Sequence, residues 1–263
     1  MGKKIMILGA SILQLPAIKQ AKAMGLDVIA VDINPNAIGF KVPNIKKSVI
    51  EAAKKHHIDG IMTLATDMPM RTVAAVVKEL GLIGIQEETA LKATNKAKMR
   101  LALQKENVPI PKFFKVSNVK EYQNAVKKFN MPFIVKPVDS SGSRGIFEVI
   151  DINNNQLIKQ AYEYCRPFSR NGDVIVEEYM KGPEVSVETL SINGECHVIQ
   201  ITDKLTTGAP HFVEMAHSQP TRHSQKIIEQ ISKIAKAANK AIGIENGPSH
   251  TEIIVTTEGP KVV

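Results

Sequence analysis

The chain has 263 residues, 43% of them hydrophobic, so it can bury a substantial core in one domain or two. Its formal net charge is +8, but only 5% of the residues are aromatic and Trp is absent, so nucleic acid is not expected as a partner and an anionic small molecule is. Short apolar runs exclude a membrane span, residues 1–15 lack a signal peptide pattern, and Cys165 and Cys196 give no disulfide framework, so we expect a cytoplasmic protein without a membrane partner.

Residues 1–93 predict a Rossmann-like α/β domain with a parallel sheet, because strand and helix patterns alternate there. The predicted strands cover residues 4–8, 27–31 and 60–64, and the predicted helices cover about 12–25, 52–56 and 69–80. Gly81 is placed to end the last of these helices. Between Asp32 and Glu51 a full α/β unit would show one more strand. Either this stretch is a short loop, or residues are missing from the sequence at this point.

Residues 94–263 predict a second, α+β domain. Asn95 and Ser224 are placed to cap helices over 96–106 and about 225–242, the second of which Gly243 ends. Asn193-Gly194 predicts a tight hairpin, and a second hairpin turns at Glu258-Gly259. An extended linker covers 108–111. The other predicted helices cover 119–129 and 156–164, and the predicted strands cover 133–136, 147–150, 174–179, 184–192, 196–202, 251–256 and 261–263.

The turn after the first strand offers one possible nucleotide site. Gly9 opens a helix whose N-terminus could bind an anion, and Asp32 ends the second strand, where it could contact a ribose. The sequence ILGASILQL lacks the second and third glycines of the dinucleotide fingerprint. An NAD-dependent dehydrogenase is therefore one alternative, and a plain turn residue at Asp32 is the other interpretation.

Two segments of the second domain carry charge in patterns that suit a nucleotide. Lys136 ends a buried strand, and the Ser/Gly loop 140–145 that follows could cradle phosphate oxygens with its backbone N–H groups. This is not a Walker A loop, because the lysine precedes the glycines, and alone it fits a plain loop equally well. The segment 175–187 is a strand that ends in Glu177 and Glu178, turns at Gly-Pro and resumes at Glu184.

In this order and spacing, the segments resemble the ATP-grasp superfamily over most of the chain. The order of the segments is most similar to that of the carboxylate–amine ligases and the relatives of the carbamoyl phosphate synthase large subunit. The resemblance implies a domain that precedes the ATP-grasp module over 1–93 and an ATP-grasp domain over 94–263, with a lid subdomain at about 112–178. It also implies ATP and Mg²⁺ as cofactors, and a C–N ligase that phosphorylates a carboxylate for attack by an amine and releases ADP and phosphate. Such chemistry needs cations around the polyphosphate and a lid that excludes water.

The resemblance also implies roles for individual residues. Lys96 and Lys136 match the two lysines that hold ATP phosphates, Glu252 matches the first magnesium carboxylate, and Arg144 and Lys204 are the expected catalytic cations. The other expected cofactor-binding residues are Ser140, Ser141, Gly142, Ser143 and Gly145 in the lid, Glu177, Glu178, Tyr179 and Met180 beside adenine, and Glu184 at the ribose. The expected substrate residues are His211, Glu214, Arg222, Asn246 and His250, of which the last two could also complete the metal site.

Two further expectations concern metals. Strand alternation puts Glu214 on the face opposite His211 and His217, so these residues do not predict zinc. The superfamily also uses a second magnesium carboxylate, followed by a polar residue and an arginine, on the strand after Glu252. Folding the hairpin places Glu252 opposite residues 263–265, so we expect a chain truncated or incompletely ordered at its C-terminus, without part of the metal site. A nucleotide-binding protein without ligase turnover is therefore a further alternative.

The substrates stay open among amino acids, a purine-pathway intermediate and bicarbonate, because fold does not fix function. Small-molecule carboxylate and amine substrates are the expected partners. A homodimer is the commonest assembly for such a protein.

Overall fold

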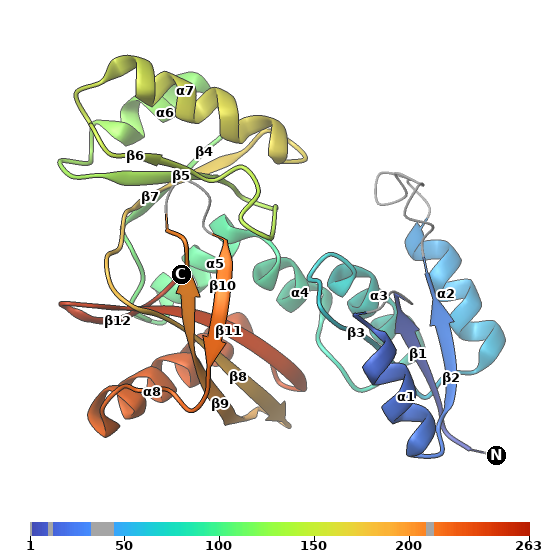
Figure 1. Ribbon diagram of the computed structural model, residues 1–263. Helices are drawn as coiled ribbons and strands as arrows, with labels where there is room; N and C mark the ends of the chain where they lie inside the picture. The colour runs from blue at the N-terminus through green and yellow to red at the C-terminus, as the bar shows by residue number, and fades with distance from the viewer. Residues whose placement is uncertain (1, 10–12, 33–44, 209–212) are drawn as a thin grey trace. The chain divides into compact units, whose positions relative to one another are not determined.

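The computed structural model describes residues 2–9, 13–32, 45–208 and 213–263 (Figure 1). The chain forms two compact units, Met1–Thr94 and Asn95–Val263. The first unit contains a parallel sheet and the second contains antiparallel sheets, so the predicted α/β class is confirmed. None of the helices in the described part of the chain is both long and apolar enough to cross a lipid bilayer.

The first unit is built around a parallel sheet in the order β2-β1-β3. Met6 and Ile7 of the central strand are fully buried, and the apolar side of α3 packs on the sheet through Val73, Val76 and Val77. Gly81 ends α3 in the left-handed conformation, as predicted. The elements of this unit are β1 (Lys4–Leu8), α1 (Leu15–Ala23), β2 (Asp27–Val31), α2 (Ile45–His56), β3 (Gly60–Thr63), α3 (Met70–Leu80) and α4 (Glu87–Ala93).

Three helices of this unit differ from the predictions. α1 starts only at Leu15, with Pro16 in its first turn, where a missing N–H is tolerated. α2 begins at Ile45, so part of the stretch between Asp32 and Glu51 is helical, while residues 33–44 lie outside the described residues. α4 was not predicted at all, because seven residues give too short a run for a helical period.

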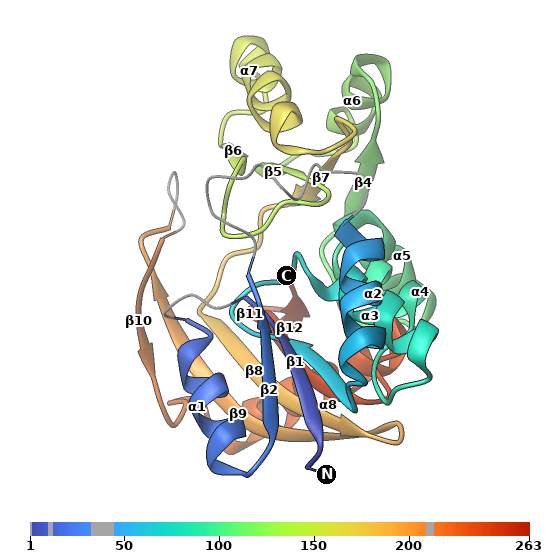
Figure 2. The ribbon, with the colours of Figure 1, turned by 90° about the vertical axis from the view of Figure 1, so that its right-hand side faces the viewer.

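The second unit opens with α5 (Lys96–Lys105), which Asn95 caps by accepting a hydrogen bond from Lys98 N at 3.0 Å. A four-stranded antiparallel sheet follows in the order β4-β7-β5-β6. Figure 2 shows α6 and α7 on the same side of this sheet, where Tyr122 and Tyr162 stack at 4.8 Å between ring centroids. The elements are β4 (Phe113–Val116), α6 (Val119–Val126), β5 (Phe133–Pro137), β6 (Phe147–Val149), α7 (Asn155–Cys165), the 3₁₀ helix η2 (Arg166–Phe168) and β7 (Val174–Glu178).

A five-stranded antiparallel sheet in the order β10-β9-β8-β11-β12 completes the unit. Asn193 and Gly194 both have positive φ, of 49° and 84°, as the predicted tight hairpin requires. Ser224 occupies the N-cap position of α8, but its side chain makes no capping hydrogen bond, so that part of the prediction is wrong. The elements are β8 (Glu184–Ile192), β9 (Glu195–Thr206), β10 (Glu214–Ser218), α8 (Gln225–Ile242), β11 (Gly247–Thr256) and β12 (Gly259–Val262).

The two faces of this second sheet differ in chemistry. The apolar stripe of α8 packs against β8, β9, β11 and β12, and the buried residues Val185, Val187 and Ile253 belong to the strand face that this helix covers. Since successive side chains of a strand point to opposite faces, the alternate residues form the other face. That face carries Glu184, Ser186 and Glu188 on β8, Thr202 and Lys204 on β9, and His250 and Glu252 on β11.

The Gly182 backbone approaches β11 too closely to allow a side chain. Its φ is 155°, and a Cβ atom would lie 2.1 Å from the carbonyl oxygen of Val255. We expect Gly182→Ala to lower the free energy of unfolding by about 2–4 kcal/mol, because backbone must shift to remove the clash. Thermal unfolding measures the change. Gly60→Ala is the control, since no atom lies within 4 Å of that Cβ position, and an equal loss in both variants would contradict the prediction.

Candidate active site

Lys204 is the centre of the polar face of the five-stranded sheet. Its Nζ lies 2.7 Å from Glu184 Oε1, 2.8 Å from Glu214 Oε1 and 2.5 Å from Glu252 Oε1. The side chain is 3% exposed, whereas the carboxylates around it are open to solvent to different degrees. Burial alone would lower the pKa of Lys204, but the three carboxylates outweigh it and raise this pKa above its usual value. Lys204 is therefore a cation at neutral pH.

His250 extends the cluster along β11. Its Nδ1 hydrogen-bonds to Glu188 Oε1 at 2.6 Å, and its Nε2 lies 3.8 Å from Glu252 Oε1. The hydrogen bond with Glu188 and the contact with Glu252 raise the pKa of His250 to about 10, so the imidazole is protonated at neutral pH. In turn, the His250 contact and the Lys204 charge lower the pKa of Glu252 to about 2, although burial opposes this. Glu252 is therefore an anion over the whole physiological range.

The cluster carries an excess of negative charge. Four carboxylates (Glu184, Glu188, Glu214 and Glu252) face two cations (Lys204 and His250), which leaves a formal charge of −2. Within the described ranges, no three His, Cys, Asp or Glu side chains are arranged to hold a metal ion by themselves. Mg²⁺ is commonly bound by one or two carboxylates together with substrate phosphates. The donor set therefore fits a magnesium ion that shares its ligands with a nucleotide, and Glu252 is the carboxylate that would hold it.

A second charge cluster joins α5 to the four-stranded sheet. Arg100 Nε lies 2.5 Å from Glu177 Oε1, and Lys136 Nζ lies 2.6 Å from Glu177 Oε2. All three residues are buried. Burial raises the pKa of Glu177, but the Arg100 and Lys136 charges outweigh it and lower the pKa to about 2. The cluster has a formal charge of +1 and contains two residues, Lys136 and Glu177, that the sequence analysis assigned to ATP.

The loop at 140–145 starts beside α5. Lys96 N donates to Val138 O at 2.7 Å, and Lys96 Nζ donates to Ser140 O at 2.5 Å. Gly142 and Ser143 have φ of 66° and 55°. Gly145 is buried at φ 76°, where a Cβ would meet the Phe168 ring at 2.7 Å. The first expected phosphate lysine and the glycine-rich loop therefore lie together, with Gly142, Ser143 and Arg144 exposed.

The strand end at 177–180 follows the Glu177 cluster. The backbone N–H of Glu178 donates to Lys112 O, and that of Tyr179 donates to Pro132 O. The Glu178 side chain accepts from Lys112 N at 3.2 Å and lies 3.7 Å from Lys261 Nζ. Met180 follows at the end of this strand, half-buried. The N–H groups of both Glu178 and Tyr179 are thus already used within the protein.

Several expected site residues do not join either cluster. Arg144 Nε donates to Ser141 O at 3.0 Å within the loop, and the backbone N–H of Arg222 donates to Asp203 Oδ2 at 3.0 Å. Asn246 Oδ1 accepts from Asn193 N at the β8–β9 hairpin. Asn246 is six residues from Glu252 on an extended chain, so it cannot complete a metal site there. His211 lies outside the described residues.

One prediction about β10 is wrong. Strand alternation placed Glu214 and His217 on opposite faces, but the β9–β10 register shifts between Glu214 and Ala216. This bulge adds a residue and returns both side chains to one face. His217 Nε2 then lies 3.4 Å from Glu214 Oε2, and Glu214 reaches Lys204. The β11–β12 register, in contrast, is the predicted one, since Val263 N donates to Glu252 O at 2.9 Å.

Two residues of these clusters were not predicted from the sequence. Glu188 follows Glu184 by four positions on β8, so period-2 alternation alone places it on the same face. Arg100 follows Lys96 by four positions on α5, but it also falls in line with the buried residues Ala97 and Leu103. A charged residue within an apolar helical stripe indicates a buried partner, and that pattern could have identified Arg100.

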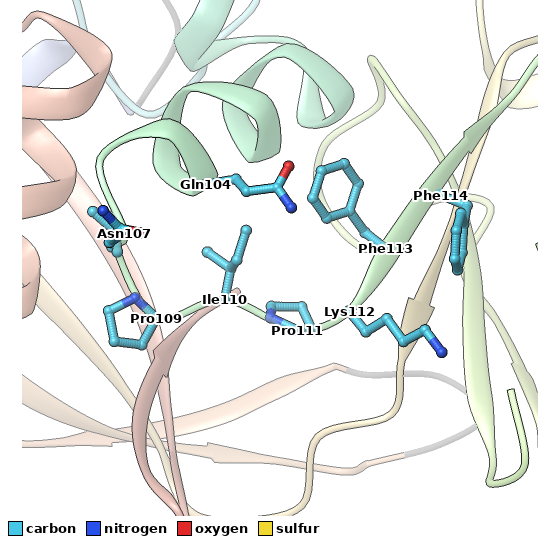
Figure 3. A pocket seen from close by; sticks show the side chains of 9 residues that line it. Gln104, Asn107, Pro109, Ile110, Pro111, Lys112, Phe113 and Phe114 are labelled. Atoms are coloured by element: carbon cyan, nitrogen blue, oxygen red, sulfur yellow. The ribbon is translucent and has the colours of Figure 1, made fainter. Parts of the chain in front are cut away.

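A cavity of about 510 Å³ lies beside the linker between α5 and β4. Figure 3 shows the Gln104 side chain directed toward Phe113, and the Lys112 side chain directed away from it. None of the described residues assigned to the nucleotide lines this cavity, although its lining residues Phe113 and Lys112 are the strand partner of Glu177 and the hydrogen-bond partner of Glu178. Its lining consists of Gln104, Asn107, Val108, Pro109, Ile110, Pro111, Lys112, Phe113 and Phe114.

An α/β first unit, an antiparallel second unit with a glycine-rich loop, and a sheet face rich in carboxylates define a nucleotide-binding protein of the ATP-grasp type. The ATP-grasp domain family matches residues 129–263, about half of the chain, and the chain belongs to this family.

Several relatives are named amino acid ligases, and others are named formate-dependent phosphoribosylglycinamide formyltransferase, such as that of Burkholderia cenocepacia, which is 29% identical over 191 residues that cover 67% of this chain and 46% of the relative. The alanine–anticapsin ligase of Bacillus amyloliquefaciens is 26% identical over 228 residues, which cover 80% of this chain and 48% of the relative. The L-arginine-specific L-amino acid ligase of Bacillus subtilis is 25% identical over 220 residues, which cover 83% of this chain and 53% of the relative. The crystal structure of an L-amino acid ligase from Bacillus licheniformis matches with a TM-score of 0.83 and 25% identity, and covers 99% of this chain and 66% of that one. The chain thus spans about half the length of these curated relatives.

Proposed function

We propose that this protein is an ATP-dependent ligase that joins a carboxylate to an amine through an acyl phosphate and releases ADP and phosphate. The observation that carries the proposal is the polar sheet face, where Lys204 bridges Glu184, Glu214 and Glu252 at 2.5–2.8 Å. A fixed cation beside an excess of carboxylates suits MgATP, because the ammonium attracts the phosphates and the carboxylates attract the metal ion. The family and the ligase relatives support the same reaction class.

The chain's own residues have distinct parts in this proposal. Lys96, Lys136 and the loop Ser140–Gly145 neutralise and cover the phosphates, with Arg144 as a further cation of the loop. The segment Glu177–Met180 receives adenine, and Glu184 receives the ribose hydroxyls. Glu252 would hold Mg²⁺, which when bound neutralises phosphate charge as a Lewis acid. Lys204, already paired with Glu252, stabilises negative charge that develops on the transferred phosphoryl group.

We further propose amino acids as the substrate class, since two of the relatives and the structure with a TM-score of 0.83 are named amino acid ligases. His211, Glu214, Arg222 and His250 remain the proposed substrate contacts. Of these, Glu214 and His250 already belong to the Lys204 cluster. Asn246 is not a proposed substrate contact, because its side chain hydrogen-bonds to the β8–β9 hairpin.

Isothermal titration with MgATP, ADP and NADH tests the nucleotide part. We expect adenine nucleotides to bind, and Lys136→Ala to weaken MgATP binding by about 100-fold, since a charged hydrogen bond to phosphate is lost in a buried setting. Lys115→Ala is the control, because Lys115 is exposed and its ion-pair partner Asp173 belongs to neither cluster. Preferential binding of NADH, or an unchanged affinity in Lys136→Ala, would contradict the assignment and favour the dehydrogenase alternative.

A screen of carboxylate and amine pairs for ADP release tests turnover. The proposal expects release that depends on both substrates. Nucleotide binding without release from any pair would favour the protein that binds nucleotide without ligase turnover.

A further inference from the structure

Arg100 is a charged residue in the buried stripe of α5, beside the apolar residues Ala97 and Leu103. Its side chain is 1% exposed, its Nε donates to Glu177 Oε1, and its Nη1 has no hydrogen-bond partner among the described residues. An unmatched buried donor lowers stability, and a buried ion pair adds little net stability compared with an apolar pair. Stability therefore gives no reason for a guanidinium at this position, whereas a role in the neighbouring site does.

Glu177, the partner of Arg100, also forms an ion pair with Lys136. Glu177 engages Arg100 with one oxygen and Lys136 with the other, and the pairing of β5 with β7 places Glu177 diagonally opposite Lys136. If Glu177 had Lys136 as its only counter-ion, the Lys136 ammonium would be required at Glu177 at all times. Moving it toward a phosphate would leave an uncompensated carboxylate in the interior, which is very costly.

Arg100 provides Glu177 with a permanent second counter-ion, because a guanidinium keeps its proton and this side chain is fixed by its burial on α5. Lys96 and Arg100 are four residues apart and share one side of α5, and Lys96 reaches the loop through Ser140 O. One helix side thus supports both the loop and the carboxylate beside the second phosphate lysine. We propose that Arg100 is a positioning residue of the nucleotide site: by holding Glu177, it leaves the Lys136 ammonium available to the phosphates of a nucleotide.

This inference rests on the proposed nucleotide site, and its test separates phosphate recognition from base recognition. The quantity measured is the ratio of the Kd for adenosine to the Kd for MgATP, from NMR and calorimetric titrations. Effects on the adenine contacts cancel in this ratio. We expect Arg100→Met to lower the ratio by about tenfold or more, because Lys136 is then retained by Glu177. Arg100→Lys keeps the charge and should leave the ratio within about threefold of the wild type.

The double variant gives the decisive comparison. In a Glu177→Gln background, Lys136 has no carboxylate to neutralise, so Arg100→Met should change the ratio by less than about twofold. This comparison also holds if Arg100→Met alone fails to fold, since the double variant has no unpaired carboxylate. An unchanged ratio in Arg100→Met, or an equal loss in the Glu177→Gln background, would overturn the proposal while leaving the nucleotide site intact. A wild-type protein that binds neither ligand would overturn the proposed function as well.

Discussion

Replacement of Lys204 by methionine is expected to lower the rate of ADP release by about 10²–10³-fold, the effect of removing one preorganised charge donor from a phosphoryl-transfer site. Methionine keeps the unbranched apolar stem of the side chain but removes the ammonium that Glu184, Glu214 and Glu252 share. The three carboxylates then repel one another and the incoming phosphates. The measurement is the initial rate with the substrate pair that the ADP-release screen identifies.

Two variants show whether the lost charge is the cause. Lys204→Arg keeps a cation and should retain much more activity than Lys204→Met. Lys115→Met removes a lysine from a surface pair with Asp173 and should retain full activity. If Lys204→Met lost activity only in proportion to a lower melting temperature, Lys204 would be a structural residue and its assigned part in the reaction would be wrong.

The sequence was sufficient for those parts of the fold that local chemistry determines. Asn95 predicts the start of α5 because its side chain replaces a missing backbone partner, and Gly81 predicts the end of α3 because only glycine takes a left-handed φ without cost. Asn193-Gly194 predicts its hairpin for the same reason. Short or irregular elements, such as α4 and the bulge between Glu214 and Ala216, leave no periodic pattern, so they were missed or predicted wrongly.

Contacts within the candidate site likewise depend on packing that local sequence patterns do not determine. The register of the Asn193-Gly194 hairpin alone would pair Glu184 with Asp203, and an irregularity between Glu188 and Thr189 shifts the pairing to Lys204. The contact between Arg100 and Glu177 joins residues 77 positions apart, on a helix and a strand, and no local pattern determines which buried charge meets which. Family resemblance assigned Lys136 and Glu177 to a nucleotide. Only the structure shows that Glu177 pairs with Lys136 and also with Arg100 of α5.

The two charge clusters have opposite sign within one compact unit. Arg100, Lys136 and Glu177 sum to +1, and the group around Lys204 and His250 sums to −2. Free polyphosphate is attracted by the first cluster and repelled by the second. A polyphosphate that carries Mg²⁺ satisfies both, because the metal neutralises the carboxylates that would otherwise repel it. Magnesium should therefore strengthen nucleotide binding, and Glu252 is the residue through which it should act.

Glu252→Gln tests this directly. We expect the wild type to bind ATP at least about tenfold more tightly with Mg²⁺ than without it, and the variant to lose most of this difference, because a neutral amide is a weak ligand for a hard cation. The rate of ADP release should fall by about 10³-fold, since the metal supplies much of the charge stabilisation. Calorimetric titration of ATP with Mg²⁺ or with a chelator measures the first effect.

The control for Glu252→Gln is Glu258→Gln, which alters an exposed carboxylate in the β11–β12 turn that pairs with Lys261. Lys204 keeps Glu184 and Glu214 in the Glu252 variant, so the cluster retains a counter-charge and the protein should fold. A Glu252→Gln protein that kept the full magnesium effect would show that the metal is held elsewhere, and the carboxylates around Lys204 would then serve only to position that lysine. Loss of the effect in both variants would instead indicate a general electrostatic influence of magnesium on a charged surface, because Glu258 lies in a turn outside the cluster.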